Sequence, residues 1–199
     1  MNVFLYLVLG YKLLDIHLLN TEIPAVKLIE TVRYVDERGY FMESFHKEAF
    51  EKEGIPADYV QDNHSTSRKG VIRGIHYQDM SAPLSKLVRC ISGEVLDVAV
   101  DLRVGSPTFG KHVKQILSDE NNLLLFIPVG FGHAFLTLSE SATVNYKCTG
   151  YYSRSAEGTV RWNDPDLNID WGIQNPFTSE KDNSAQTLEE YLKNPAFEQ

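Results

Sequence analysis

Short apolar runs that alternate with polar residues dominate the chain from residue 23 to residue 171. Glycine, proline, asparagine and aspartate interrupt these runs at short intervals, a pattern typical of an all-β sandwich or barrel. Helical periodicity is confined to residues 46–53 and 187–193, so we expect only a few short peripheral helices. No internal repeat or low-complexity linker divides the chain. The pattern predicts a single domain over residues 19–199, preceded by an extension, residues 1–18, to which we assign no structure.

Two segments illustrate the predicted strands. In residues 95–102 (VLDVAVDL) the even-numbered apolar side chains point one way and Asp97 and Asp101 the other, which predicts a strand with one buried face. Residues 142–148 (ATVNYKC) alternate in the same manner. Their pattern predicts that Tyr146 faces inward among apolar neighbours.

Two short breaks that contain glycine separate neighbouring apolar runs. Residues 92–94 (SGE) lie between KLVRCI and the strand at 95–102, and we interpret this break as a hairpin turn. Residues 128–130 (PVG) form a similar break between LLLFI and FGHAFLTL.

The charge balance limits the partners of the chain. Lys and Arg total 19 against 27 Asp and Glu, a formal net charge of −8 at pH 7, so a broad basic surface for nucleic acid or anionic lipid is missing. The apolar run at residues 3–9 is far shorter than the ~20 residues that span a bilayer. It also lacks the flanking features of a secretory signal. The spacing of Cys90 and Cys148 indicates neither a zinc knuckle nor a disulfide scaffold. We therefore expect a cytoplasmic protein without nucleic-acid or membrane partners.

Two segments place a histidine next to glycine: residues 70–78 (GVIRGIHYQ) with His76, and residues 128–133 (PVGFGH) with His133. Their spacing resembles the two motifs of the cupin superfamily, a double-stranded β-helix of the jelly-roll type. Metal-binding cupins usually carry a second histidine two positions after the first. This chain has a glutamine there, a poor ligand, and a lysine follows at position 86. We expect no metal and no cofactor.

The first histidine segment also contains Arg73. Strict alternation would place Arg73 and His76 on opposite faces of a strand. Both can reach one pocket only if Gly74 carries a bulge or kink. The sequence therefore predicts an irregularity at Gly74.

Most of the chain, residues 23–182, resembles the dTDP-4-dehydrorhamnose 3,5-epimerase family. The resemblance implies a cupin-type fold and an isomerase that inverts both carbons flanking the ketone of dTDP-4-dehydro-6-deoxy-D-glucose, without a cofactor, to give dTDP-4-dehydro-L-rhamnose. Matching segments are residues 36–45 (DERGYFMESF), 59–65 (YVQDNHS), 70–78, 86–111, 127–140, 146–152 (YKCTGYY), 161–171 (RWNDPDLNIDW) and 179–182 (SEKD).

The resemblance also implies catalytic roles. Such a reaction needs a base beside the ketone, a donor for the enolate oxygen and an acid on the opposite face. By similarity His76 is the base, Asp182 is the carboxylate that fixes its tautomer, and Tyr146 is the acid. Lys86 would lie near the developing enolate oxygen.

Binding residues follow from the same similarity, and guanidinium groups among them suit diphosphate oxygens. Residues 79–85 (DMSAPLS) depart from the family pattern, which affects the expected pocket rim. The family is typically a homodimer in which an N-terminal strand joins the partner's sheet. The implied contacts to the dTDP-sugar are Arg38, Glu43, Gln61, Asp62, Asn63, Arg73, Lys86, His133, Glu157 and Lys181.

Three alternatives stay open at this point. The chain could be an epimerase acting at one carbon only or on a related keto-deoxysugar nucleotide, because the same catalytic set serves both. It could be a metal-dependent cupin enzyme, against which the glutamine at position 78 argues. It could also be a non-catalytic sugar-binding jelly roll, for which an acid and a base on opposing walls would have no purpose.

Overall fold

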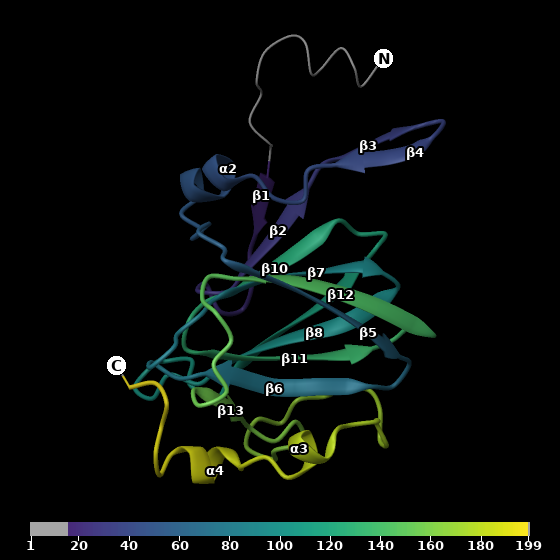
Figure 1. Ribbon diagram of the computed structural model, residues 1–199. Helices are drawn as coiled ribbons and strands as arrows, with labels where there is room; N and C mark the ends of the chain where they lie inside the picture. Colours follow the sequence, from purple (N-terminus) through teal and green to yellow (C-terminus); the bar gives the residue numbers. More distant parts are fainter. Residues whose placement is uncertain (1–15, 199) are drawn as a thin grey trace.

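The computed structural model describes residues 16–198, which form two antiparallel sheets, a separate hairpin and short helices (Figure 1). The apolar run at residues 3–9 and most of the predicted extension lie outside the described residues. The strands are β1 (Ile16–Leu19), β2 (Lys27–Thr31), β3 (Arg33–Asp36), β4 (Gly39–Met42), β5 (Gln61–Arg68), β6 (Ile72–Gln78), β7 (Lys86–Ser92), β8 (Glu94–Asp101), β9 (His112–Ser118), β10 (Leu123–Ile127), β11 (Phe131–Thr137), β12 (Ser141–Cys148) and β13 (Glu157–Thr159), and the helices are α2 (Lys47–Lys52), α3 (Glu180–Asn183) and α4 (Leu188–Tyr191).

The two sheets form a jelly roll. The first has the strand order β1-β2-β10-β7-β12-β5 and the second the order β13-β6-β11-β8-β9, while among the described strands β3 and β4 pair only with each other. From β5 to β13 the chain crosses from one sheet to the other at every step except that from β8 to β9, as in a double-stranded β-helix. This arrangement confirms the predicted all-β cupin-type fold. Strand β1 also spans the expected boundary at residue 18, because it pairs with β2 along its whole length.

The hairpin interpretation of residues 92–94 is wrong. Strand β7 pairs with β10 and β12 in the first sheet, whereas β8 pairs with β11 and β9 in the second. Residues 128–130 likewise carry the chain from β10 in the first sheet to β11 in the second. Alternation is a local property of a strand, and it is the same whether the next strand lies beside it or in the facing sheet.

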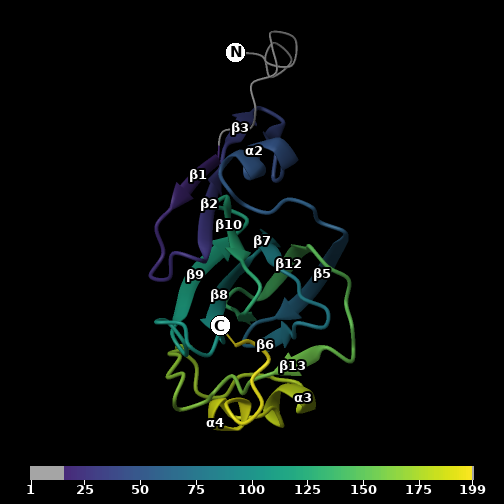
Figure 2. The same ribbon diagram turned by 90° about the vertical axis from the view of Figure 1, so that its left-hand side faces the viewer.

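The main core lies between the sheets, and a second core lies outside the second sheet. Val95 and Ala99 of β8 belong to the inner core, but Val98 packs in the outer core with Trp171. The C-terminal segment with α3 and α4 covers this outer face (Figures 1 and 2). The prediction of one buried face for β8 is therefore wrong. Both faces are buried, and Asp97 is 0% exposed inside the molecule.

The predicted irregularity at Gly74 is confirmed. In the pairing of β6 with β11, His76 lies opposite His133, but Arg73 lies opposite Phe135, so β6 holds one extra residue. Gly74 has a φ of +125°, and a Cβ atom there would lie 2.4 Å from the Cβ of Ala134. Only glycine fits this conformation and this close approach.

The predicted helices are present as short elements. Helix α2 packs over the outer side of the first sheet, where Phe50 belongs to a third apolar cluster with Leu87 and Leu124. Helix α4 begins after Thr187, whose side chain caps it in a capping box. None of the helices in the described part of the chain has the length and apolar character required to cross a membrane.

Candidate active site

A cavity of about 170 Å³ opens between the two sheets. Strands β5, β6, β7, β12 and β13 all contribute side chains to it, so strands from both sheets form its walls. Three of the four predicted catalytic residues line it. The lining consists of Gln61, Asn63, His76, Tyr77, Gln78, Leu84, Lys86, Tyr146, Cys148, Tyr152 and Glu157.

A hydrogen bond joins His76 to Asp182. The His76 Nε2 atom lies 2.6 Å from the Asp182 Oδ1 atom, and the aspartate side chain is 4% exposed. Burial opposes ionisation of Asp182, but the hydrogen bond and charge attraction from His76, with further hydrogen bonds from Ser179 and the Gly74 backbone, outweigh it and hold the pKa of the carboxyl below its ordinary value. An ionised carboxylate in this position fixes the orientation of the imidazole and leaves its other ring nitrogen for a substrate.

Tyr146 faces the cavity as its alternation predicts. It packs against the inner core, and its ring lies 6.4 Å from the ring of His133 in an edge-on arrangement. Burial raises the pKa of the Tyr146 phenol. The phenol therefore stays protonated at neutral pH and is able to donate a proton into the cavity.

Lys86 supplies positive charge to the same cavity. Its Nζ atom lies 5.7 Å from the centre of the Tyr146 ring, and within residues 16–198 it forms neither an ion pair nor a hydrogen bond. Burial lowers the pKa of Lys86 because the cavity solvates the ammonium poorly. A cation without a partner in a poorly solvated site is well suited to stabilise a developing oxyanion.

Polar side chains surround the entrance. Gln61 donates through Nε2 to the Asn63 Oδ1 atom at 3.0 Å and accepts from the Tyr152 backbone N–H at 3.0 Å. Glu157 pairs with Lys181 at 2.6 Å and accepts from the Tyr152 hydroxyl at 3.1 Å. These contacts hold the predicted binding residues Gln61, Asn63 and Glu157 at one cavity.

Arg73 and Lys181 line a neighbouring cavity of about 290 Å³. His76 borders both cavities, and Asp182 borders the second. Arg73 donates through Nε to the Ser67 Oγ atom at 2.9 Å. The bulge at β6 thus brings Arg73 and His76 to one site, and two cations flank the His76–Asp182 pair.

Four predicted binding residues lie outside these cavities. His133 is buried beside the first cavity, and its Nε2 atom lies 2.9 Å from Asp97 Oδ2. Burial outweighs the attraction of Asp97 and lowers the pKa of His133, which keeps the ring neutral. Asp62 lies on the opposite face of β5 and pairs with Lys147 at 3.0 Å. Arg38 and Glu43 belong to the β3–β4 region, where Arg38 pairs with Asp36.

Sequence reasoning missed several lining residues. Gln78 donates to the Ala82 carbonyl at 2.7 Å and accepts from the Ser153 backbone N–H at 2.6 Å, so it fixes the loops at the rim. Tyr152 occurs in the matching segment 146–152, which was the available signal. For Leu84 the available signal was the departure of residues 79–85 from the family pattern, which was expected to affect the pocket rim.

The described residues offer side-chain chemistry rather than a metal centre. Among residues 16–198, histidine, cysteine and acidic side chains do not gather in groups of three or more that could hold a metal ion. The expectation that the chain works without a metal stays a prediction. The cavity combines an imidazole, a phenol and an ammonium group, a set suited to proton transfer beside a carbonyl.

Comparisons with known proteins agree with this chemistry. The sequence model of the dTDP-4-dehydrorhamnose 3,5-epimerase family matches residues 20–190. A dTDP-4-dehydrorhamnose 3,5-epimerase from Shigella flexneri is 50% identical over 171 residues, which cover 85% of this chain and 94% of that protein.

Solved structures give the same result. A dTDP-6-deoxy-D-glucose-3,5-epimerase from Legionella pneumophila Philadelphia 1, in complex with dTDP-4-keto-L-rhamnose, is similar with a TM-score of 0.85 at 47% identity, covering 88% of this chain and 94% of that one. ChmJ, a 3'-monoepimerase from Streptomyces bikiniensis in complex with dTDP-quinovose, gives a TM-score of 0.84 at 35% identity, covering 89% and 90%. By sequence and by fold, the chain belongs to the dTDP-4-dehydrorhamnose 3,5-epimerase family.

Proposed function

We propose that the chain epimerises dTDP-4-dehydro-6-deoxy-D-glucose at both carbons flanking the ketone and so forms dTDP-4-dehydro-L-rhamnose for dTDP-rhamnose biosynthesis. The observation that carries the proposal is that His76, held by buried Asp182, shares one cavity with the protonated phenol of Tyr146 and the ammonium of Lys86. Family membership supports the same activity.

Each inversion proceeds through an enolate. His76 takes a proton from the carbon beside the ketone, and the electron pair of that C–H bond shifts the carbonyl π electrons onto oxygen. Lys86 stabilises this oxygen. Tyr146 then returns a proton to the opposite face of the carbon as the enolate collapses, and solvent restores both groups. No electrons leave the substrate, so the chemistry requires no redox cofactor.

The remaining predicted residues are proposed to hold the nucleotide. Gln61, Asn63 and Glu157 lie around the entrance, and Arg73 and Lys181 lie beside the His76–Asp182 pair. In a chain of net charge −8, local cations of this kind are needed to attract a diphosphate.

A specific observation supports a second function, inversion at one carbon only. ChmJ is described as a 3'-monoepimerase and has the same fold at 35% identity. The same base, acid and ammonium group serve inversion at one carbon or at two. Proton NMR of the product from purified protein distinguishes them, because each inverted carbon changes its ring coupling constants.

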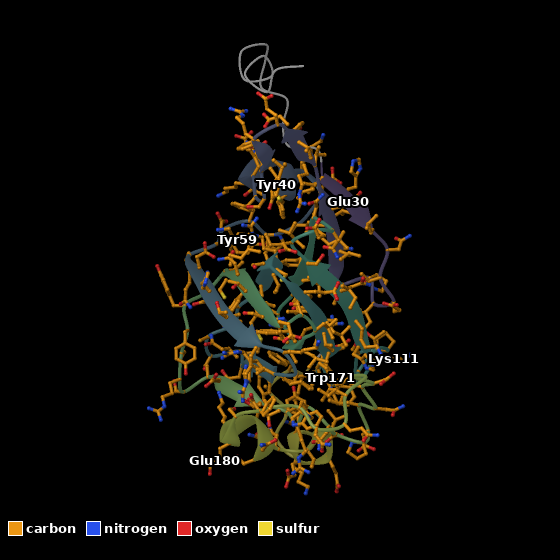
Figure 3. The ribbon with its side chains drawn as sticks, turned by 90° about the vertical axis from the view of Figure 1, so that its right-hand side faces the viewer. Glu30, Tyr40, Tyr59, Lys111, Trp171 and Glu180 are labelled. Carbon is orange, nitrogen blue, oxygen red and sulfur yellow. The ribbon has the colours of Figure 1, made fainter. Side chains whose placement is uncertain are left out.

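We further propose that the protein works as a cytoplasmic homodimer. The β3–β4 hairpin projects from the body, with Tyr40 near the end of the molecule opposite Trp171 (Figures 1 and 3). On this hairpin Val35 is 74% and Phe41 is 52% exposed. Exposed apolar residues on a projecting hairpin indicate a protein partner. A second copy would bring Arg38 and Glu43 to the nucleotide site, and β1 is an edge strand suited to pairing.

The Tyr146→Phe variant tests the division of roles between base and acid. In D₂O, His76 should still remove and return protons on its own face, so deuterium enters beside the ketone without inversion. Net epimerisation should fall by about 10²–10⁴-fold, the usual contribution of a general acid. Proton NMR measures both processes in one sample.

The matched control is His76→Asn, which should lose exchange and inversion together. Wild-type turnover in the Tyr146→Phe variant would contradict the assignment.

The pH profile tests the role of Lys86. Because burial lowers its pKa, kcat should fall as pH rises through a value below that of an ordinary lysine, since only the ammonium stabilises the enolate. Tyr146 cannot cause a fall of kcat at this lower pH, because burial raises the pKa of its phenol. In Lys86→Arg the fall should move to higher pH, and Lys86→Met should lose about 10²–10³-fold in kcat at every pH. An alkaline fall that stays in place in Lys86→Arg would refute this role.

Sedimentation equilibrium tests the dimer. The wild type should have a mass of about 45 kDa, twice the 22.6 kDa of one chain. A charge at the hairpin surface, as in Val35→Glu, should yield monomers and raise KM, because the partner's hairpin is lost. A wild-type mass of one chain, or a variant with unchanged mass and KM, would count against the dimer.

A further inference from the structure

Leu84 gives one part of the active-site cavity an apolar wall. Of the side chains that line this cavity in the described chain, only Leu84 is aliphatic, and the others are polar or aromatic or, in one case, a thiol. Neither the acid, the base nor the enolate requires an aliphatic neighbour. An apolar group of the substrate would explain a leucine at this position.

Leu84 lines a part of the cavity that adjoins the inner core. Tyr152 at the entrance is 56% exposed. Leu84 and Lys86, in contrast, also border a second, small pocket together with Ile127 and Phe131 of the core. Leu84 and Lys86 thus both line the part of the cavity that adjoins the core.

The backbone around Leu84 is held on both sides. Before it, the Ala82 carbonyl accepts a hydrogen bond from Gln78 at 2.7 Å. After it, Ser85 donates from its backbone N–H to the Thr149 hydroxyl at 2.9 Å, and its carbonyl accepts from the Thr149 backbone N–H at 3.1 Å. A Cβ atom on Gly150 would lie 3.3 Å from the Leu84 Cβ, so this loop packs closely. The leucine wall is preorganised.

We propose that Leu84 is the specificity-determining contact for the C6 methyl group of the sugar. This inference rests on the proposed function. The nucleotide is attached at C1, across the ring from the C4 ketone, so the ketone enters first and meets Lys86 where the cavity adjoins the core. C5 is bonded to the ketone carbon, and its methyl group lies beside the ketone oxygen. Leu84 is the aliphatic side chain at that place.

The contact selects a 6-deoxysugar by two effects. Burying the methyl group against Leu84 removes apolar surface from water, and a methylene-sized difference in an apolar pocket gives about 10–200-fold discrimination. A hydroxymethyl group in the same place would bury a hydroxyl against an aliphatic wall without a hydrogen-bond partner. Leu84 thereby complements Lys86, which recognises the adjacent oxygen.

The test compares two substrates, dTDP-4-dehydro-6-deoxy-D-glucose and its analogue with hydrogen in place of the C6 methyl group. Deuterium exchange at C3 is common to both and gives kcat/KM for each. The wild type should prefer the methyl-bearing substrate by about tenfold or more. Leu84→Ala should reduce the preference to less than about threefold, and Leu84→Val should give an intermediate value. Leu84→Met keeps the apolar volume and should keep the preference.

The ratio of the two kcat/KM values separates a role of Leu84 in specificity from a purely structural role. A leucine that only fills space would lower kcat/KM for both substrates alike, and the ratio would not move. A wild-type ratio near one, or a wild-type ratio retained in Leu84→Ala and Leu84→Val, overturns the inference while leaving the epimerase activity in place. Absence of exchange at C3 in the wild type with either substrate overturns the proposed function itself, and the inference with it.

Discussion

The hydrogen bond between His76 and Asp182 is the interaction on which the site depends. It joins two residues 106 positions apart, one on β6 and one on α3, so it forms only when the C-terminal segment has folded over the second sheet. The same segment buries the outer face of β8. Packing of the outer core and orientation of the base are therefore one structural event.

In the proposed mechanism, the cavity separates chemical tasks by position. Proton transfer is assigned to His76 and Tyr146, and charge stabilisation to Lys86. The proposed recognition of the substrate is divided between polar groups at the entrance and Leu84. Because the strands that carry these groups belong to two facing sheets, their spacing follows from the packing of the inner core rather than from any single loop.

Local patterns in the sequence predicted local features of the structure. Alternation placed Tyr146 inward, and the shared pocket of Arg73 and His76 required the bulge at Gly74. Such local patterns could not predict which distant segments of the chain pair with each other. The break at residue 93 joins two sheets, and Asp97 is buried because it faces the inner core, on the same side of β8 as Val95 and Ala99, and bonds to His133 there. The partnership of His76 with Asp182 came from family resemblance alone, since no periodicity links residues so far apart.

The most direct test of the account is the turnover of Asp182→Asn, measured beside the binding of dTDP by calorimetry. An amide keeps the shape but removes the charge that orients His76, so kcat should fall by about 10²–10⁴-fold. The dissociation constant for dTDP should stay within about twofold, because Asp182 bonds to His76 and is assigned no contact to the nucleotide. Turnover close to that of the wild type, with binding intact, would contradict the claim that the His76–Asp182 pair drives the reaction.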